Sequence, residues 1–505
     1  MPGEKGEDPV RELARMLSQS KIVLSGDVSR SVLQEVNLDL LASKVIESKA
    51  ESTLALNIIT AEEISQIINS MKVDKTPLPI EVIRSSDYKP IASEIDARYN
   101  VTNRPNDRAS GSAADFVSYF SSRLAKTRSF IEAHRNFILL PNIKSLESLT
   151  SGREVCITGI VTNKITTKKG NIMVTIEDDT GSVKVMFMAG TSQQARDLTQ
   201  KAINIINDEV IAVRGKISNI FVIASEMVWP DVPVISKKTV DDDVAIAFMS
   251  DIHVGSKRFM QKNFERVIQW LNGNVAEKKD LAGKVKYIIM AGDVADGIGI
   301  YPGQENDLAI FDIYEQYAML FKYIDAIPDY IQVFVMPGNH DAVQRAEPQP
   351  PLTNELLRDF RKDNVHILSN PSWVNAHGLD ILAYHGTSLD SMISAISGMS
   401  YASPEKAMIE VLRRRHLSPI YGGNVIVPSK EDNLVIEKVP DIMHFGHIHK
   451  NGLADYHGVA IVNSGTWQAR TDFQIRQGHI PTPCVLPVYE AKTQRFSQID
   501  FSGEQ

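Results

Sequence analysis

Cysteine is scarce in this sequence: Cys156 and Cys484 are the two among 505 residues, and they lie far apart in the chain. A disulfide framework and a cysteine-based zinc site are therefore unsupported, and we expect a reducing compartment. No apolar run reaches the roughly 18 residues that a membrane-spanning helix needs, and the first ten residues, MPGEKGEDPV, are charged rather than signal-like. We expect a soluble cytoplasmic protein, associated with the nucleoid and with no membrane partner.

An excess of positive charge is also lacking, because 54 Lys and Arg stand against 62 Asp and Glu and the net charge is −8. This balance argues against a protein that wraps nucleic acid through general basicity. A local basic face or a bound metal ion would still attract a phosphate backbone. Hydrophobic residues make up 43% and charged residues 23%, as in ordinary globular proteins. A chain of this length predicts two or three folded units.

Four regions differ in their residue patterns. Residues 1–75 show helical periodicity and predict a small α-helical module, either a docking domain or a segment without an independent role. Residues 76–113 are rich in Pro, Ser, Asn and charge, which is typical of a flexible linker. Residues 114–235 begin with a helical pattern and continue with short β-rich runs. Residues 240–505 alternate strand-like and helical segments, which predicts a layered α/β domain.

The β-rich runs of residues 114–235 predict an OB-fold β-barrel, because five short strands occur with a helix before the fourth. OB barrels often bind single strands through basic and aromatic side chains. Lys168 and Lys169, in a predicted turn, are candidates for DNA contact, but aromatic residues are sparse in this region. A scaffold or interface role is therefore the preferred interpretation of the barrel.

Polar side chains follow the apolar runs of the last region, at the ends of predicted strands. They are Asp251 and His253 in SDIHVG, Asp293 in AGDVADG, Asn339 and His340 in PGNHDA, His385 in YHGT, and His447 and His449 in GHIH. Ligands bind at the carboxyl ends of strands in open α/β sheets, and residues two apart on an extended segment face the same side. We therefore expect these side chains to converge on one pocket.

The ligand types in this set indicate a metal centre. Carboxylate, imidazole and amide groups without thiolate suit Mn²⁺, Fe²⁺, Zn²⁺ or a similar ion, and one aspartate between two such groups can bridge a pair. Such a pair of ions clamps a phosphodiester and activates a water molecule. Any one of these motifs is weak, since a histidine at a strand end is usually a packed or solvated residue. The inference rests on the joint order DxH, GD, GNHD, HG and GHxH.

That order resembles the calcineurin-like metallophosphoesterase superfamily, whose motifs are all matched between Asp251 and His449. With the helical and OB-like segments that precede them, the chain is similar to the family of small, exonuclease subunits of archaeal family D DNA polymerases. The related B subunits of eukaryotic replicative polymerases have lost metal ligands, whereas every ligand position is filled here. The resemblance implies a multidomain protein whose last domain is a layered β-sandwich flanked by helices.

The resemblance also implies a role for each matched residue. One metal ion would take Asp251, His253 and His449, the other would take Asn339, His385 and His447, and Asp293 would bridge the two. Mn²⁺ is the ion expected from the family, with Mg²⁺ or another divalent ion as alternatives.

The catalytic residue that the resemblance implies is His340, which would stabilise charge on the reacting phosphate or protonate the leaving 3′ oxygen. Asp341 would orient His340 through its other ring nitrogen, or would serve only as a turn residue. Asp296 is either an acid that supports the metal ligands or a solvated turn residue.

The function implied by the resemblance is a 3′–5′ exodeoxyribonuclease. It would proofread single-stranded or mismatched DNA 3′ ends in replication, beside a large polymerase subunit and with a sliding clamp as a further partner. Arg413, Arg414 and Arg415 form a basic run that is either a DNA contact or a solvated helix face. Arg470 meets either a phosphate or a carboxylate.

Two other functions stay open at this point. A stand-alone metallophosphoesterase or repair nuclease would carry the same motifs, although the long segment before them is not needed for that role. A non-catalytic accessory subunit is the other alternative. It is disfavoured because buried carboxylates and imidazoles without a metal ion would be left unpaired, at a cost in stability.

Overall fold

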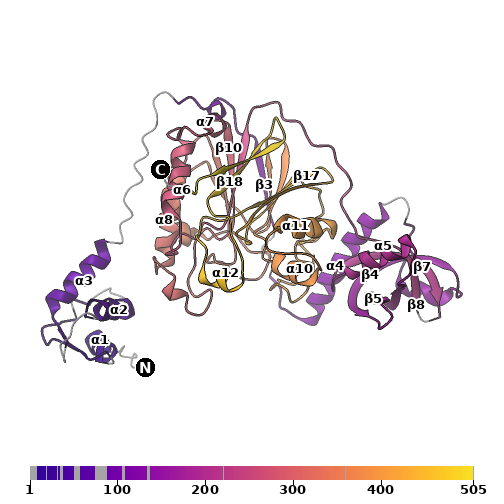
Figure 1. The fold of residues 1–505 in the computed structure, drawn as a ribbon, viewed down its shortest axis with the longest axis horizontal. Helices are drawn as coiled ribbons and strands as arrows, with labels where there is room; N and C mark the ends of the chain where they lie inside the picture. The colour runs from indigo at the N-terminus through magenta and orange to yellow at the C-terminus, as the bar shows by residue number, and fades with distance from the viewer. Residues whose placement is uncertain are drawn as a thin grey trace. The chain divides into compact units, whose positions relative to one another are not determined.

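The structure is a computed structural model that describes residues 8–18, 20–30, 32–33, 38–49, 57–73, 88–104, 108–133, 137–219, 221–358 and 360–503 (Figure 1). The chain divides into two compact units, Met1–Pro79 and Ile80–Gln505, each with its own core. Within the described ranges, every helix is too short or too polar to span a bilayer.

The first unit packs three helices with a pair of short parallel strands. The elements are α1 (Pro9–Ser18), β1 (Ile22–Leu24), α2 (Leu38–Lys49), β2 (Asn57–Ile59) and α3 (Ala61–Val73). Leu13 and Leu17 of α1 are fully buried with Leu41 and Val45 of α2, as the spacing of four along each helix dictates. The strand pair was not predicted from the sequence, because a three-residue strand shows no periodicity.

The second unit contains the predicted five-stranded barrel, which is confirmed. Its elements are α4 (Ala113–Glu132), η2 (Ile143–Ser148), β4 (Glu154–Thr166), β5 (Ile172–Asp178), β6 (Gly181–Phe187), α5 (Gln193–Ile203), β7 (Val210–Ser218) and β8 (Phe221–Val228). The strands close in the order β4-β5-β6-β8-β7. Alternate residues of β5, Ile172, Val174 and Ile176, fill the barrel interior because successive side chains of a strand point to opposite faces.

Two six-stranded sheets form the rest of this unit. The first has the order β12-β11-β10-β9-β18-β19 and contains β9 (Ala245–Met249), β10 (Val285–Ala291), β11 (Gln332–Met336), β12 (Val365–Ile367), β18 (Val485–Glu490) and β19 (Arg495–Asp500). The second has the order β16-β17-β15-β14-β13-β3 and contains β3 (Tyr99–Asn103), β13 (Ser372–Ala376), β14 (Leu379–Ala383), β15 (Ile442–Phe445), β16 (Asn451–Tyr456) and β17 (Val459–Ser464). Strands β9, β10, β11 and β12 run parallel, and so do β14, β15 and β17.

The two sheets pack face to face and carry helices on their outer faces. On β9, Ile246 and Phe248 point into the core shared with the second sheet, while Ala247 and Met249 point toward the helices. The connecting helices are α6 (Gln261–Leu271), α7 (Lys279–Ala282), α8 (Ile313–Asp325), α9 (Asn354–Leu357), α10 (Leu389–Ala395), α11 (Pro404–Arg413) and α12 (Asp472–Arg476), with 3₁₀ turns η1 (Ile91–Ser93) and η3 (Gln304–Asn306). Because both faces of β9 are covered, its sequence is apolar throughout.

The structure differs from the expected linker over residues 76–113. Residues 99–103 form β3, which pairs antiparallel with β13 at the edge of the second sheet. The sequence does not reveal this strand because its side chains are mostly exposed, so YNVTN lacks the apolar alternation of a buried strand. The part of the expected linker at 76–87 and 105–107 lies outside the described residues.

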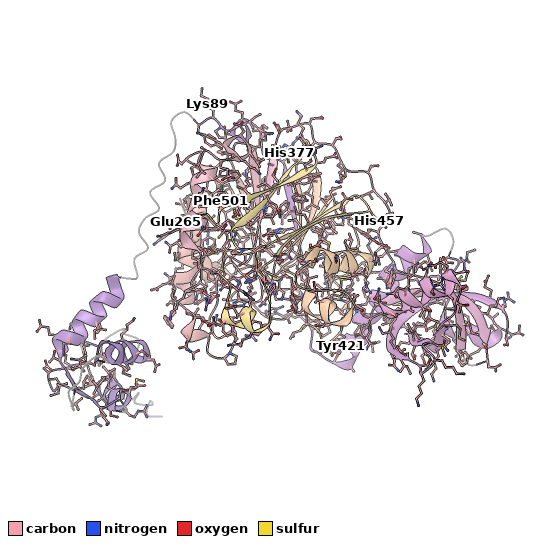
Figure 2. All side chains as sticks on the ribbon, in the orientation of Figure 1. Lys89, Glu265, His377, Tyr421, His457 and Phe501 are labelled. Carbon is pink, nitrogen blue, oxygen red and sulfur yellow. The ribbon has the colours of Figure 1, made fainter. Side chains whose placement is uncertain are left out.

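The barrel joins the α/β domain through buried ion pairs. Arg123 of α4 donates from Nε to Asp432 Oδ2 at 2.8 Å, and His416 Nε2 lies 2.8 Å from the same oxygen. Arg414, after α11, pairs with Glu209 of the barrel, whose other oxygen accepts from Trp229 Nε1 at 3.0 Å. Tyr421 lies beside α4, where its ring meets those of two phenylalanines of that helix (Figure 2).

Candidate metal centre

Five loops that leave the carboxyl ends of parallel strands carry the candidate ligands. Strand β9 ends before Asp251 and His253, β10 before Asp293, β11 before Asn339 and His340, β14 before His385, and β15 before His447 and His449. The structure gathers the aspartates and histidines among them into three overlapping groups, and within each group the ligand atoms lie within 4.8 Å of one another. Helices α10 and α12, which follow β14 and β17, lie along this same edge of the sheets (Figure 1).

The first group consists of Asp251, His253 and His449. His449 Nε2 lies 3.2 Å from Asp251 Oδ1 and 3.2 Å from His253 Nε2. Asp251 Oδ2 accepts from the backbone N–H of His447 at 2.9 Å, whereas Oδ1 is buried without a hydrogen-bond partner among the described residues. A buried carboxylate oxygen that lacks a donor and faces an imidazole nitrogen is an arrangement that a cation would stabilise.

The second group consists of Asn339, His385 and His447 around Asp293. His385 Nε2 lies 2.9 Å from Asn339 Oδ1 and 3.3 Å from Asp293 Oδ2. The rings of His385 and His447 are 5.2 Å apart at an angle of 73°. Asp293 Oδ2 also lies 3.9 Å from His253 Nε2, so this one oxygen faces both groups.

Outer hydrogen bonds set the tautomers of the ligand histidines. His253 Nδ1 lies 2.9 Å from Asp296 Oδ1, and His385 Nδ1 lies 2.8 Å from the Ala291 carbonyl. A carboxylate and a carbonyl only accept, so each Nδ1 carries the proton and each Nε2 is left to face the pocket. Asp296, which sequence reasoning left between two roles, is therefore a buried support for His253 rather than a solvated turn residue.

Two supporting residues were missed by sequence reasoning. Asp390, in the first turn of α10, holds His447 Nε2 at 2.9 Å, which leaves Nδ1 of that ring for a metal ion. Gln474 of α12 places its amide 2.9 Å from His449 Nδ1. Neither lies in a recognisable motif, and no signal short of the fold indicates them.

The expected contact between Asp341 and the ring of His340 is wrong. Asp341 accepts from the backbone N–H groups of Val294, Ala295 and Gly338 at 2.8–3.2 Å and from Tyr317 Oη at 3.0 Å. It thus ties the loop after β10 to the loop after β11. His340 is oriented instead by the Asp296 carbonyl, 2.8 Å from its Nδ1.

The ligand backbone is held in an uncommon conformation. Asp251, His253, Asp293, His447 and His449 all have positive φ, between 49° and 66°. Residues other than glycine seldom adopt this region, and its cost persists only where the surrounding structure imposes it. The two ligands of each DxH or HxH pair therefore reach the pocket through left-handed turns, and not because they alternate on an extended segment as the sequence argument assumed.

Glycine is required beside two of these ligands by close approach. A Cβ on Gly338 would lie 2.3 Å from Asp293 Oδ1, and a Cβ on Gly446 would lie 2.5 Å from Asp251 Oδ2. Any larger residue would push the carboxylate out of place. The glycines of GNH and GHIH are thus part of the geometry of the centre.

The electrostatics of the centre favour cations. Burial opposes the charged form of His253, but the neighbouring Asp296 raises its pKa to about 9. Burial likewise opposes protonation of His385, yet the charge of Asp293 raises its pKa to about 10. Burial and the charge of Asp293 raise the pKa of Asp341 to about 6. A divalent ion would have to displace the imidazole protons, and the oxygen and nitrogen donors that remain suit such an ion.

The arginine run does not form a DNA-binding face. Arg414 is buried against Glu209 and Glu410, and Arg415 is buried and donates to the carbonyls of Ile436 and Glu437 at 2.7 Å. The prediction of DNA contact is therefore wrong for Arg414 and Arg415, whose guanidinium groups hold α11 to the barrel and to the following loop.

The remaining basic candidates occupy three places. Arg413 is partly exposed and pairs with Glu410. Lys168 and Lys169 are exposed in the turn between β4 and β5 of the barrel, and their contact with DNA stays a prediction. Arg470 lies in the loop before α12, at the edge of the sheets that carries the ligands, and has no ion-pair partner among the described residues.

Two packed sheets with outer helices, and Asp, His and Asn side chains gathered at the ends of parallel strands, define an α/β sandwich with a candidate metal centre. A family model for the B subunits of DNA polymerases alpha and epsilon matches residues 246–451, a range that contains every candidate ligand. The chain belongs to the family of DNA polymerase II small subunits, as its similarity to curated members shows.

Three of these relatives give the extent of the similarity. The DNA polymerase II small subunit of Archaeoglobus fulgidus is 40% identical, over 85% of this chain and 86% of that protein. Those of Methanocaldococcus jannaschii and Pyrococcus horikoshii are 40% and 38% identical, over 80% and 84% of this chain and 69% and 70% of theirs. A solved archaeal phosphodiesterase is 15% identical and covers 51% of this chain and 99% of its own, with a TM-score of 0.26. A likeness that weak carries no inference, so the family rests on the sequence relatives.

Proposed function

We propose that this chain is a 3′–5′ exodeoxyribonuclease that proofreads DNA 3′ ends beside a large polymerase subunit. The observation that carries the proposal is the clustering of the candidate ligands, with His340 among the grouped residues and Asn339 beside His385. A non-catalytic scaffold would gain nothing from five ligand residues held at positive φ around buried carboxylates. We propose a large subunit as the partner because the relatives are themselves named small subunits of a polymerase.

The ligand groups would hold two divalent ions, for which we propose Mn²⁺ first and Mg²⁺ or another divalent ion second. Asp251, His253 and His449 would bind one ion, and Asn339, His385 and His447 the other, with Asp293 facing both. When bound, such a pair supplies Lewis acidity toward a phosphodiester and lowers the pKa of a water molecule.

His340 would move the proton at the leaving oxygen. Its Nδ1 donates to the Asp296 carbonyl in either protonation state, so Nε2 is the nitrogen that titrates. Burial lowers the pKa of His340, which makes its imidazolium a stronger acid. Its backbone N–H donates to Asp293 Oδ1 at 2.8 Å, so the ring is tied to the centre of the ligand set. The protonated ring would donate from Nε2 to the 3′ oxygen as the P–O bond breaks.

The substrate would be an unpaired 3′ end. Entry of a DNA end into a pocket of this kind requires its bases to leave the duplex, and that costs least at a mismatch. Selectivity for errors would then come from fraying at the large subunit rather than from base recognition in this chain.

The proposal is tested by the variant His340→Ala with end-labelled single-stranded and mismatched DNA. The chain is assayed alone and with its large subunit, in Mn²⁺, in Mg²⁺ and with a chelator. We expect metal-dependent loss of nucleotides from the 3′ end in the wild type, and a drop of at least about 100-fold in the variant, the range of an acid–base group. Metal content should stay within the error of the wild-type value.

The matched control is His366→Ala, because His366 is a partly buried histidine of β12 that hydrogen-bonds Gln332 outside the centre. It should cleave as the wild type does. Cleavage by His340→Ala at the wild-type rate, or 5′-to-3′ digestion by the wild type, would overturn the proposal. If the wild type cleaves no DNA with either metal ion, the function of a non-catalytic accessory subunit is favoured instead.

A further inference from the structure

One rim of the metal centre is formed by the segment around α12, which folds back over His449. The backbone N–H of Thr482 donates to the His449 carbonyl at 2.9 Å, and the amide of Gln474 reaches His449 Nδ1. The N–H of His479 donates to the Gln474 carbonyl at 2.8 Å. Residues from 470 to 482 therefore border the pocket directly.

Three basic residues belong to this rim. Lys450 follows His449 in sequence, Arg470 precedes α12, and His479 follows it. The Arg470 carbonyl accepts from Arg258 Nη1 at 3.0 Å, which fixes the loop that carries it. Besides burial, the charges of His449, Lys450 and Arg470 lower the pKa of His479, to about 4.

The charge of this cluster is not neutralised within the described residues. Lys450 and Arg470 are half-buried and form no ion pair there, while Arg470 Nε and His479 Nε2 are buried atoms without a hydrogen-bond partner. Two acids of the same region have other partners: Asp390 pairs with His447, and Asp472 pairs with Arg258. Half-buried cations without counter-charges are costly unless an anion joins them.

We propose that Lys450, Arg470 and His479 form a phosphate subsite that holds the internucleotide phosphate on the 5′ side of the scissile bond. The subsite rests on the proposed function. It adds that the substrate is a strand with more than one phosphodiester. A 3′ end carries no further phosphate beyond its terminal nucleotide, so any second phosphate at the centre lies 5′ of the bond that breaks. Lys450 and Arg470 supply charge, and His479, neutral at pH 7, supplies a hydrogen bond.

The same rim offers apolar surface to bases. Phe473 and Ile480 are each 64% exposed and Ile475 is 51% exposed, all within the segment that carries Arg470 and His479. Cations that follow a backbone, interleaved with exposed apolar side chains, are typical of a groove for single strands rather than for a mononucleotide or a phosphoprotein.

The test compares two substrates in the full chain loaded with Mn²⁺. Bis(p-nitrophenyl) phosphate is a phosphodiester with one phosphate, and a 3′-labelled single-stranded oligonucleotide has many. We expect the double variant Lys450→Ala/Arg470→Ala to lower the ratio of kcat/KM values, oligonucleotide over small diester, by about 10-fold or more, mainly through KM. His479→Gln should lower the ratio less, because it removes no charge at pH 7.

Lys492→Ala is the matched control. Lys492 is an exposed lysine in the turn after β18, where Glu490 pairs with Ala245 at the start of β9, so it lies at the edge of that sheet opposite Asp251. This variant should keep the wild-type ratio. An unchanged ratio in Lys450→Ala/Arg470→Ala, or a loss of both activities together with metal content, would overturn the subsite.

Binding of a fluorescent oligonucleotide, measured by anisotropy, tests the subsite without cleavage. The subsite can therefore be refuted independently of the proposed nuclease function. In a His340→Ala background, removal of Lys450 and Arg470 should weaken binding and reduce the slope of log affinity against log salt by about 0.7 for each lost phosphate contact. Equal affinities and slopes would overturn the subsite even if the chain is a nuclease. A wild type that binds DNA through these residues but never cleaves it would overturn the nuclease alone.

Discussion

At the scale of single residues, Asp293 occupies the one position that both ligand groups share. Its Oδ1 is fixed by the backbone N–H of His340, and its Oδ2 faces His385 at 3.3 Å and His253 at 3.9 Å. Although burial opposes its ionisation, the nearby imidazoles hold the pKa of Asp293 well below its usual range. The carboxylate is thus charged and directed at both groups before any ion arrives.

Asp293→Asn removes this charge with little other change. Asparagine keeps an oxygen for the His340 N–H, and it tolerates the positive φ of 49° at this position better than most residues do. We expect the affinity for both ions to fall by more than the 10–100-fold typical of a lost outer hydrogen bond to a ligand. Metal analysis after dialysis should find fewer than two ions per chain, and full retention would show that Asp293 does not bridge.

The ligands were predictable from sequence because each follows an apolar run and carries a motif, as the pair His447 and His449 illustrates. The supporting residues were not predictable in the same way. Asp390 meets His447 from the start of a helix, and Gln474 meets His449 from a segment 25 residues further on. Such contacts depend on how loops close over the pocket, which no local pattern records.

At the scale of elements, periodicity predicted the barrel strands and the strands of the sandwich. Their buried positions, alternating or continuous, are occupied by apolar residues that the sequence shows directly. It failed where an element is held by its neighbours. β3 is an edge strand recruited by β13, and the arginines that follow α11 resemble a solvated basic face. Arg414 and Arg415 are buried because the barrel and the loop at Ile436 pack over them, which is a tertiary effect.

Arg414→Ala tests whether that ion pair holds the barrel to the α/β domain. The change would leave the Glu209 carboxylate buried without its arginine partner, while Trp229 Nε1 would still donate to it at 3.0 Å. We expect a loss of about 3–5 kcal/mol in the free energy of unfolding, as for other buried pairs that lose one partner. Denaturant titration followed by tryptophan fluorescence measures it.

The control for this prediction is an exposed ion pair of the same unit. Lys237 lies 2.7 Å from Asp455, and 36% and 49% of these two side chains are exposed, so Lys237→Ala should cost at most about 1 kcal/mol. Equal losses in the two variants would mean that burial does not distinguish the pairs.

At the scale of the whole molecule, the barrel and the α/β domain form one unit, whereas residues up to Pro79 form another. Part of the junction is polar: Arg123, Asp432 and His416 share one buried cluster. A polar junction fixes the partners' geometry, because a displaced ion pair would lose its compensation. The same cluster makes the unit sensitive to pH.

His416 gives that sensitivity a definite sign. Burial, together with the charge of Arg123, lowers the pKa of His416, and its Nδ1 accepts from the Ser418 N–H, so the folded ring is neutral. The unfolded ring takes up a proton below a pH of about 6.5, and stability is therefore lost as the pH falls through that value, by at most about 1.4 kcal/mol per pH unit. Asp432 does not contribute in this window, because, although burial opposes its ionisation, His416 and Arg123 keep its pKa below its usual range.

Unfolding of the metal-free chain at pH 7.5 and pH 5.5 should show this loss directly. His416→Gln removes the titrating group but keeps an amide that can reach Asp432, and the histidines of the metal centre contribute equally in both proteins. The wild type should therefore lose more stability than His416→Gln between the two pH values, even though the variant is the less stable protein at pH 7.5. Parallel losses would mean that the His416 ring is not held neutral, and that the junction between the barrel and the α/β domain is open to water.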